Sequence, residues 1–316
     1  MEMNTETNTI QELMNLKSAD SGVLWRLKCN AAEKTILPTR EEFWQQLVMA
    51  LLTSQQKSTE GMPVSRFALK HPFPLSLATY QGLNDEGVKA TIHSHGLRFG
   101  QRITGFLRHN YKWLFETGGG WTTIEPLLQK LVSQREKAPE VGQKPMERDV
   151  AHVLADHLKG IGPKQSRNLL QELGLTRYEI PLDSRVVGWL RENLNWTIPI
   201  DDLNHHKTYE MHLDRVQAAC DAAGVLPAVF DAAAFVVGKS RTPPRGFSTA
   251  PGYVNRNSQI VIRNTNLPGT DKGQSVYQLA CVICGHVYGA NGSDIFERKC
   301  PKCQGGAAGL LLGPSN

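Results

Sequence analysis

Apolar residues recur at helical spacing from about residue 40 to residue 238. The spacing of three to four residues is clear in EEFWQQLVMALLTS, RDVAHVLADHL, QSRNLLQELG and SRVVGWLREN. Strand-like alternation is scarce there, and breakers such as HPFPL and ETGGGW separate the segments. The pattern predicts a mainly α-helical domain over residues 41–240, folded as two lobes around a groove.

The character of the chain changes after this domain. The stretch RTPPRGFSTAPGYVNRNSQ is rich in Pro, Gly, Ser and Arg, which is typical of a linker, whereas QIVIRN and SVYQLACVI have the pattern of short strands. We therefore expect five parts: an N-terminal segment at 1–40, the helical domain at 41–240, a linker at 241–274, a small β module at 275–305 and a flexible tail at 306–316.

Composition and charge narrow the class of protein only slightly. The chain has 316 residues, 40% of them hydrophobic and 21% charged, and its net charge of +5 is compatible with a polyanionic partner. No stretch reaches the roughly 18 uninterrupted apolar residues of a membrane helix. The start, MEMNTETNTIQELMNL, is polar and acidic, unlike a secretory signal or a transit peptide. We expect a cytoplasmic protein without a membrane partner.

Four of the six cysteines form one cluster near the C-terminus. Cys281, Cys284, Cys300 and Cys303 make two CxxC pairs separated by 15 residues. In a cytosolic chain such a pattern favours metal over disulfides, because two CxxC turns bring four thiolates onto one tetrahedral ion. The segment resembles zinc ribbon and rubredoxin-like modules over about residues 275–305. We expect structural zinc, with iron in the same four-cysteine site and a pair of disulfides as the alternatives.

Three basic residues lie beside the second CxxC pair. Arg298, Lys299 and Lys302 favour a contact with phosphate, so the module is a candidate to grip DNA. A solvated basic face explains these residues almost as well.

The stretch LKGIGPKQSRNLL, residues 158–170, interrupts a helical pattern. Gly160 and Gly162 suit a tight turn, and Pro163 suits the first turn of a new helix, so we expect a helix, a hairpin and a second helix. Such a turn presents backbone N–H groups that bind a phosphate oxygen without reading sequence. Lys164 follows the turn directly, and Asp183 comes nineteen residues later, where another helix begins. Taken singly, Lys164 is explained as a solvated side chain and Asp183 as an N-cap.

Taken together, these features resemble the helix-hairpin-helix DNA glycosylase superfamily. LVMALLTSQQKS upstream and LPAVFDAAAFVVGKS downstream are similar to its early and last core helices, so the resemblance covers about residues 40–240. A lysine directly after the hairpin, nineteen residues before the aspartate, is typical of the bifunctional branch, similar to 8-oxoguanine glycosylase/lyases and endonuclease III.

The resemblance implies a reaction for the two residues. Lys164 would attack C1′ of the target nucleotide, displace the base and form a Schiff base, which permits elimination of the 3′-phosphate. Asp183 would remain ionised, stabilise positive charge on the sugar and move protons to and from Lys164.

The resemblance also implies double-stranded DNA with a damaged or modified base as the partner of a monomeric enzyme. We expect DNA contacts from Gly160, Ile161, Gly162, Gln55 and Arg185. The target base must leave the stack. Gln55 and the aromatic residues Trp189, Phe230 and Phe235 are candidates for the pocket or the wedge. Trp189 and Phe235 lie at helical spacing among apolar residues, which favours ordinary core packing for these two.

Three departures leave the excised base open. Arg185 stands where the superfamily often has a histidine, the spacing of the cysteines differs from the iron–sulfur motif of endonuclease III-like proteins, and residues 1–40 are too few for an extra β domain. Oxidised guanine is the first expectation for the base, and a bulky modified cytosine in foreign DNA is the alternative. A protein of another class, which binds DNA without catalysis through the hairpin and the cysteine module, is also consistent with the sequence.

Overall fold

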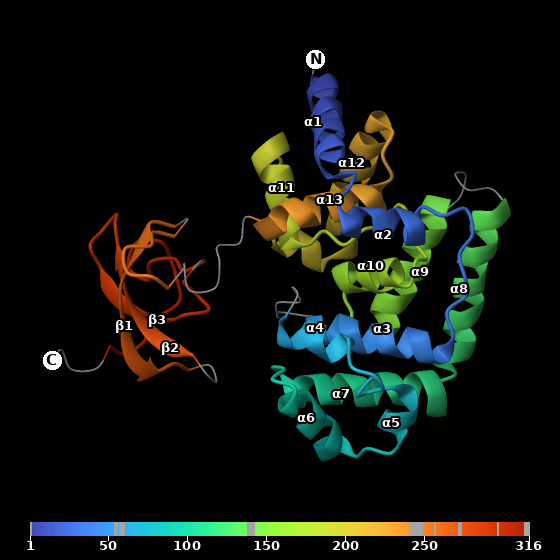
Figure 1. The fold of residues 1–316 in the computed structure, drawn as a ribbon, viewed down its shortest axis with the longest axis horizontal. Helices are drawn as coiled ribbons and strands as arrows, with labels where there is room; N and C mark the ends of the chain where they lie inside the picture. Colours follow the sequence, from blue (N-terminus) through green and yellow to red (C-terminus); the bar gives the residue numbers. More distant parts are fainter. Residues whose placement is uncertain are drawn as a thin grey trace. The chain divides into compact units, whose positions relative to one another are not determined.

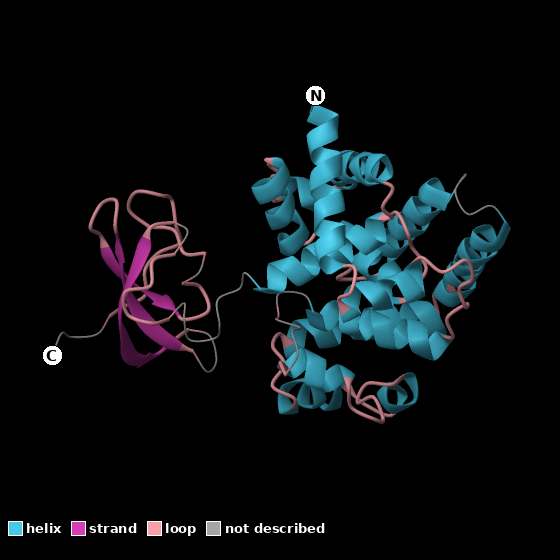
Figure 2. Ribbon diagram, turned by 45° about the horizontal axis from the view of Figure 1, so that its top comes forward, coloured by secondary structure: helices cyan, strands magenta, loops and turns pink. Residues whose placement is uncertain are grey.

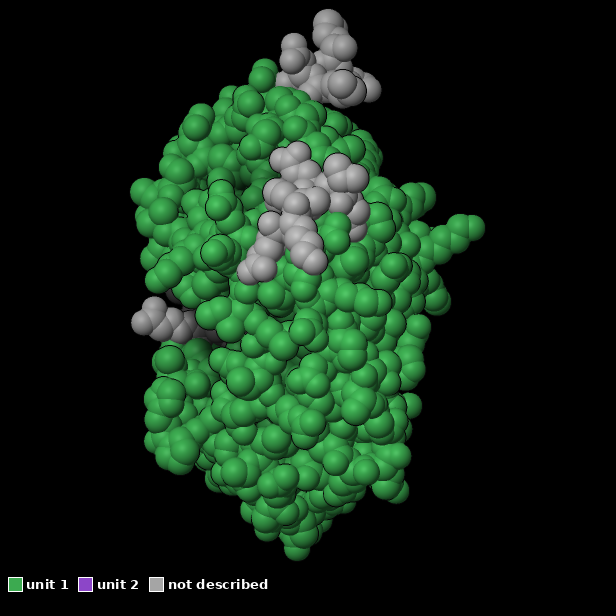
Figure 3. Space-filling model, turned by 90° about the vertical axis from the view of Figure 1, so that its right-hand side faces the viewer, with its two compact units in different colours: residues 1–239 green, residues 240–316 purple. Residues whose placement is uncertain are grey.

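The fold comes from a computed structural model that describes residues 2–53, 56, 61–137, 143–240, 249–255, 257–270, 274–295 and 297–312. The chain divides into two compact units, residues 1–239 and residues 240–316. In Figure 3 the atoms of the first unit, drawn in green, form one continuous surface.

The first unit is helical throughout (Figures 1 and 2), as the apolar periodicity predicts. Its elements in chain order are α1 (Glu2–Lys17), α2 (Ser21–Asn30), α3 (Arg40–Thr53), α4 (Pro63–Ala68), α5 (Leu77–Gln81), α6 (Asp85–Ser94), α7 (Gly100–Tyr111), the π-helical turn η1 (Lys112–Glu116), α8 (Gly120–Lys137), α9 (Gln143–His157), α10 (Pro163–Glu172), α11 (Ser184–Leu194), the 3-10 turn η2 (Asp201–Asn204), α12 (His206–Ala223) and α13 (Pro227–Ser240).

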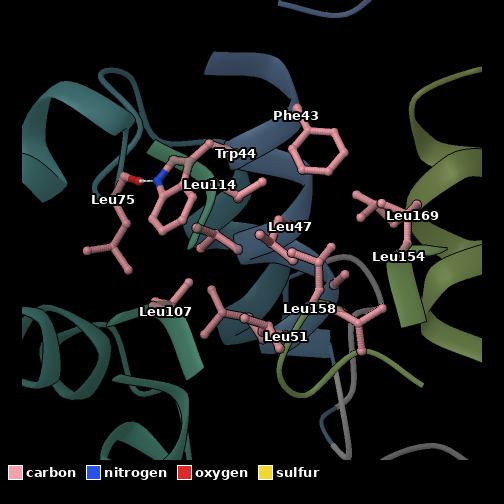
Figure 4. Packing of buried hydrophobic residues seen from close by; sticks show 14 of the residues in the cluster. Phe43, Trp44, Leu47, Leu51, Leu75, Leu107, Leu114, Leu154, Leu158 and Leu169 are labelled. Carbon is pink, nitrogen blue, oxygen red and sulfur yellow. Dashed lines mark hydrogen bonds between the residues drawn. The ribbon is translucent and has the colours of Figure 1, made fainter. Parts of the chain in front are cut away.

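A first hydrophobic core forms around α3. The buried side chains of this helix recur every three to four residues, and they pack against leucines of α7, α9 and α10 (Figure 4). The indole of Trp44 donates from Nε1 to the carbonyl oxygen of Leu75, at 2.9 Å, which satisfies its one buried polar group. The core extends from Phe43 to Leu175, and we call the helices that build it, α3 to α10, the first lobe.

A second core is built by helices from both ends of the unit. Ile10 and Leu13 of α1 and Val23 of α2 are buried together with residues of α11, α12 and α13. We call these five helices the second lobe. The two lobes agree with the predicted fold class. The expected N-terminal segment at 1–40 belongs to the helical unit, because Ile10, Leu13 and Val23 are buried in one core with helices more than 150 residues further along the chain.

The second unit is a three-stranded antiparallel sheet in the order β1 (Gln259–Pro268), β2 (Ser275–Cys281) and β3 (Val287–Asn291). QIVIRN forms part of β1, as its pattern predicts, although β1 lies within the residues 241–274 that were expected to be a linker. β1 belongs to the module, because Val261 enters the small core that Leu279 and Tyr288 also form. Within the expected tail, Leu310 pairs with Gly289, so residues before 313 are attached to the sheet.

No single helix of the described residues is long and apolar enough to cross a membrane. Taken as a pair, α12 and Pro227–Val237 satisfy the length and composition criteria, with a bend of 99° between them.

Candidate functional site

The predicted hairpin joins α9 to α10, and glycine is required at its first turn position. Gly160 has φ of +84°, and a Cβ atom there would lie 2.4 Å from Cδ2 of Phe106 and 2.8 Å from Cδ2 of Leu51. Both backbone conformation and space therefore exclude a side chain. Gly162 differs, because it has φ of −107° and open space at its Cβ position.

The hairpin is fixed to the first lobe on both sides of the turn. The buried Asn110 side chain accepts from the N–H of Lys159 at 2.7 Å and donates to its carbonyl at 3.0 Å. Ile161 is buried at the tip of the turn, in the first core. The backbone of the turn is thus held rigidly, as a phosphate-binding turn requires.

Lys164 occupies the second position of α10, and its neighbours in the chain are anchored. The carbonyl of Pro163 accepts from Nη1 of Arg167 at 2.9 Å and from Oγ of Ser166 at 3.1 Å. The Gln165 amide donates to the carbonyl of Ala50 in α3 at 3.0 Å. Lys164 is half-buried, and its Nζ makes no ion pair with any described residue.

Asp183 is the N-cap of α11. Its Oδ1 accepts from the backbone N–H groups of Arg185 at 2.8 Å and Val186 at 3.0 Å. Oδ2 has only the longer approach of Arg185 Nη1, at 3.7 Å, within the described part of the chain. Asp183 therefore does cap α11. The cap uses Oδ1, and Oδ2 makes no hydrogen bond to the residues of this helix, all of which are described.

A buried arginine and a buried tyrosine connect the segments that carry Lys164 and Asp183. Arg167 is fully buried, donates from Nε to Oε2 of Glu179 at 2.7 Å, and lies over the ring of Tyr209. The Tyr209 hydroxyl donates to the carbonyl of Ile180 at 2.9 Å and accepts from the N–H of Leu182 at 2.7 Å. Burial raises the pKa of Tyr209, so the hydroxyl keeps its proton.

A buried carboxylate organises the backbone before Asp183. Glu147 of α9 accepts from the N–H groups of Arg177, Tyr178 and Glu179, at 2.8 to 2.9 Å, and from the hydroxyl of Thr176. Burial raises the pKa of Glu147, and these hydrogen bonds oppose the shift. The segment between the lobes is thus held by α9.

A second buried carboxylate lies in the same region. Asp231 of α13 accepts from the Gln171 amide at 2.8 Å. Burial, followed by the negative charge of Asp183, raises the pKa of Asp231 to about 7. Its protonation therefore changes near neutral pH and responds to Asp183.

Sequence reasoning missed Glu147, Arg167, Tyr209 and Asp231. One feature of the sequence could have revealed such a residue, namely a charged side chain on the apolar side of a predicted helix. Arg167 is an example, because it lies between apolar positions of α10. Such a residue indicates a buried ion pair, but it does not identify the partner.

The other expected site residues have mixed outcomes. The guanidinium of Arg185 stacks on Phe235, with Cζ 4.0 Å from the ring centroid, and its Nη1 lies 3.7 Å from Oδ2 of Asp183. Trp189 and Phe230 are buried and pack edge to face at 5.2 Å, which supports the core interpretation. Gln55 lies outside the described residues.

The four cysteines of the second unit converge as predicted. The Sγ atoms of Cys281 and Cys303 are 3.6 Å apart, as are those of Cys284 and Cys300, and all four lie within 4.8 Å of one another. A disulfide needs about 2.0 Å, whereas sulfurs around tetrahedral zinc are about 3.8 Å apart. The geometry fits one metal ion held by four thiolates.

The environment of Cys281 favours a thiolate. Desolvation raises the pKa of Cys281, but N–H groups of Cys284 and Ile283 and the Gln259 amide outweigh it and lower the pKa to about 6. Metal ligands of this type must be deprotonated.

Arg298, expected to contact phosphate, is used within the module. Its Nη2 donates to the carbonyls of Ala307 and Ala308, at 2.8 and 2.5 Å, and its guanidinium lies over the ring of Tyr288. Arg298 therefore holds the C-terminal residues against the sheet.

No family model matches the chain, and no curated protein matches it. Among solved structures, an 8-oxoguanine DNA glycosylase of Methanocaldococcus jannaschii has a TM-score of 0.52 and 15% identity, with 74% of this chain and 94% of that chain covered. A glycosylase/lyase of the same organism in complex with a 15mer DNA containing 8-oxoguanine also has a TM-score of 0.52 and 15% identity, and 73% of this chain and 97% of that chain are covered. The 8-oxoguanine DNA glycosylase of Thermotoga maritima has a TM-score of 0.52 and 17% identity, and 75% of this chain and 98% of that chain are covered. The chain thus shares the helix-hairpin-helix fold of the 8-oxoguanine DNA glycosylases, with an added four-cysteine module.

Proposed function

We propose that this protein is a DNA glycosylase with AP lyase activity, which excises a damaged or modified base from double-stranded DNA. The observation that carries the proposal is the arrangement of Lys164 and Asp183. Each begins a helix, and the residue before each is fixed by the buried pair of Arg167 and Tyr209.

Lys164 is the nucleophile in this proposal. Its neutral Nζ attacks C1′, the glycosidic bond breaks, and the base leaves with the bonding electron pair and takes up a proton. Nζ then loses one proton, the C1′–O4′ bond breaks as O4′ takes up a proton, and the opened sugar is left as a protonated Schiff base on Nζ. Removal of a proton from C2′ then expels the 3′-phosphate, which is the lyase step.

Asp183 has two functions in the same scheme. Oδ1 caps α11 and so holds the side chain in place. Oδ2 faces the developing positive charge on the sugar and exchanges protons with Nζ of Lys164.

The hairpin supplies the phosphate contact. Gly162 is the N-cap of α10 and provides no side chain to cap the helix, so the first N–H groups of α10 are available to an anion. We infer that Gly160, Ile161 and Gly162 bind the DNA backbone, with Arg185 and Gln55 as further DNA contacts.

Oxidised guanine is the substrate that we favour. Support comes from the fold, which is shared with glycosylases named for 8-oxoguanine, one of them solved with DNA containing that base. A bulky modified cytosine is the alternative base, because Arg185 stands where the superfamily often has a histidine.

The test is strand cleavage on a panel of oligonucleotides, each with one modified base, followed by borohydride trapping. We expect a covalent protein–DNA adduct that Lys164→Gln abolishes. Lys159→Gln is the matched control, because Lys159 is an exposed lysine of the same hairpin. If Lys164→Gln still forms the adduct, or if no abasic or modified substrate yields one, the lyase proposal is wrong.

A DNA-binding protein without catalysis is the second candidate, supported by the hairpin and the cysteine module. In that case Lys164→Gln would lower the affinity only modestly and reduce the salt dependence by about one ion's worth. Binding without adduct formation on every substrate would favour this candidate.

We also infer that the four cysteines hold structural zinc. The thiolate ligands and the closed set of four sulfurs are the support. Metal analysis with a visible spectrum separates the alternatives, because zinc is colourless and iron in a four-thiolate site is not.

A further inference from the structure

Two histidines and a glutamate come together on the helical unit, and the proposed function gives none of the three a catalytic or DNA-binding role. His152 lies on α9, and His206 and Glu210 lie on α12. One ligand atom from each lies within 4.8 Å of the others. The imidazole rings are 4.4 Å apart and meet edge to face, and Nε2 of His152 is hydrogen-bonded to Oε1 of Glu210.

One ring nitrogen of His206 is buried without a partner in the described part of the chain. Nδ1 is shielded from solvent and has no hydrogen-bond partner among the described residues, which is a costly state for a buried polar atom. Nε2 lies 3.7 Å from Oδ1 of Asp156. A carboxylate beside one nitrogen and an unpartnered second nitrogen is the arrangement of histidines that bind metal ions.

The charges around the cluster also favour a cation. Arg167 lies 3.7 Å from Glu210, but its charge is already balanced by Glu179, which it approaches to 2.7 Å. In the connected group, four carboxylates face two guanidinium groups. The carboxylates are Asp156, Glu179, Glu210 and Asp214, and the guanidinium groups are Arg148 and Arg167. With neutral histidines, two negative charges are left, which a divalent ion would neutralise.

We propose that His152, His206 and Glu210 form a second metal site, selective for a divalent first-row ion such as Zn²⁺. Two imidazoles and one carboxylate suit this class of ion and leave a coordination position open. Tetrahedral ligands at about 2.1 Å from zinc are about 3.4 Å apart, so the side chains need to move only slightly.

The position of the site gives it a mechanical effect. α9 contributes Val150 and Leu154 to the first core, and α12 contributes Leu213 and Val216 to the second. A bound ion therefore cross-links the two lobes. The cross-link lies beside Arg167, which also holds the carbonyl of Pro163.

The experiment uses the full chain with its four-cysteine site filled by Zn²⁺, to which Co²⁺ is then added. Cobalt bound by nitrogen and oxygen gives visible d–d bands without the near-ultraviolet thiolate charge transfer of a cysteine site. We expect one equivalent of cobalt with the nitrogen–oxygen spectrum and a higher Tm on addition of Zn²⁺. His152→Gln and His206→Asn should remove both effects, and Glu210→Gln should weaken binding at least tenfold.

His205→Ala is the matched control, because His205 is the exposed neighbour of His206 and lies outside the cluster. It should bind cobalt as the unmodified protein does. The proposal is overturned if the unmodified protein takes up no second equivalent, or if folded His152→Gln and His206→Asn bind as well as His205→Ala. These readouts do not depend on DNA, so a failed glycosylase assay leaves them unaffected.

Discussion

The guanidinium of Arg167 lies over the ring of Tyr209, with Cζ 4.5 Å from the ring centroid. Arg167 holds the carbonyl of Pro163, directly before Lys164, and Tyr209 holds the N–H of Leu182, directly before Asp183. One stacked pair thus sets the backbone next to both candidate catalytic residues, although neither member belongs to the hairpin or to α11.

Tyr209→Phe tests this relationship. The substitution keeps the ring and removes the hydroxyl, so the N–H of Leu182 and the carbonyl of Ile180 lose a buried partner. We expect a loss of about 1–3 kcal/mol in the free energy of unfolding. We also expect slower base excision with little change in DNA affinity, because the Asp183 segment becomes less well positioned.

Tyr80→Phe is the matched control for urea unfolding and single-turnover kinetics. The hydroxyl of Tyr80 is buried and has no hydrogen-bond partner in the described parts of the chain, so its removal should be neutral or stabilising. Equal effects of the two substitutions would show that the Tyr209 hydroxyl has no special role.

Gly160→Ala should damage the hairpin. A methyl group there meets Phe106 and Leu51 and requires a positive φ, so we expect a loss of at least about 1 kcal/mol and weaker DNA binding. Gly162→Ala is the comparison, because its added methyl meets no atom within 4 Å. Thermal unfolding and DNA titration of both variants measure the difference, and a larger loss for Gly162→Ala would contradict the expectation.

Two substitutions of Asp183 separate its role as a helix cap from the role of its negative charge. Asparagine caps a helix as well as aspartate, so Asp183→Asn should leave Tm nearly unchanged while base excision falls. Asp183→Ala should lose activity and, in addition, about 0.5–2 kcal/mol of stability. Calorimetry beside the cleavage assay distinguishes these outcomes, and full activity in Asp183→Asn would exclude a role for the charge.

Asp231 makes stability depend on pH. Its pKa is raised from 3.8 to about 7 in the folded protein, so the folded state binds more protons than the unfolded state between these values. The free energy of unfolding should therefore fall as pH rises from about 4 to about 7, by on the order of 3 kcal/mol, and level off above that.

Asp231→Asn should remove this decline and be more stable than the unmodified protein at pH 8. Urea midpoints between pH 4.5 and pH 8.5 measure the slope. Asp149→Asn is the control, since Asp149 is exposed and should keep the decline. Because the charge of Asp183 also raises the pKa of Asp231, Asp183→Asn should shift the decline to lower pH.

Loss of a cysteine ligand should affect the second unit alone. Cys284→Ser removes one of four sulfur ligands, so the metal ion that we propose for this site should be lost on dialysis and the sheet should unfold at lower temperature. The transition of the helical unit should stay where it is, because the two units are separately compact. Cys29→Ser, in the helical unit and outside the cluster, should keep the bound metal in a metal analysis.

The sequence predicted the elements whose signals are local. Helical periodicity identified the core helices, the Gly160–Gly162 spacing identified the hairpin, and the CxxC spacing identified four converging thiolates. Each of these depends on residues within about 25 positions of one another, where spacing alone fixes the geometry.

Features that depend on distant partners were not predictable. Tyr209 has the pattern of an ordinary buried helix residue, and only the tertiary fold places its hydroxyl against Leu182. The sequence of residues 1–40 gave no sign that Ile10 packs in one core with residues of α12. QIVIRN was predicted as a short strand, but only its pairing with β2 shows that it belongs to the module, which was expected to begin at residue 275.

The residues that make up the two cores decide the order in which the two lobes can fold while the chain is being synthesised. The first core uses residues 43 to 175, so all of its residues have been synthesised before about the last quarter of the helical unit, residues 176–239, is made. The second core contains both Ile10 and Ala234, so α1 and α2 must wait through nearly the whole of translation for all of their packing partners. Lys164 therefore lies in the lobe that can fold first. The helix that Asp183 caps belongs to the lobe whose core is completed last.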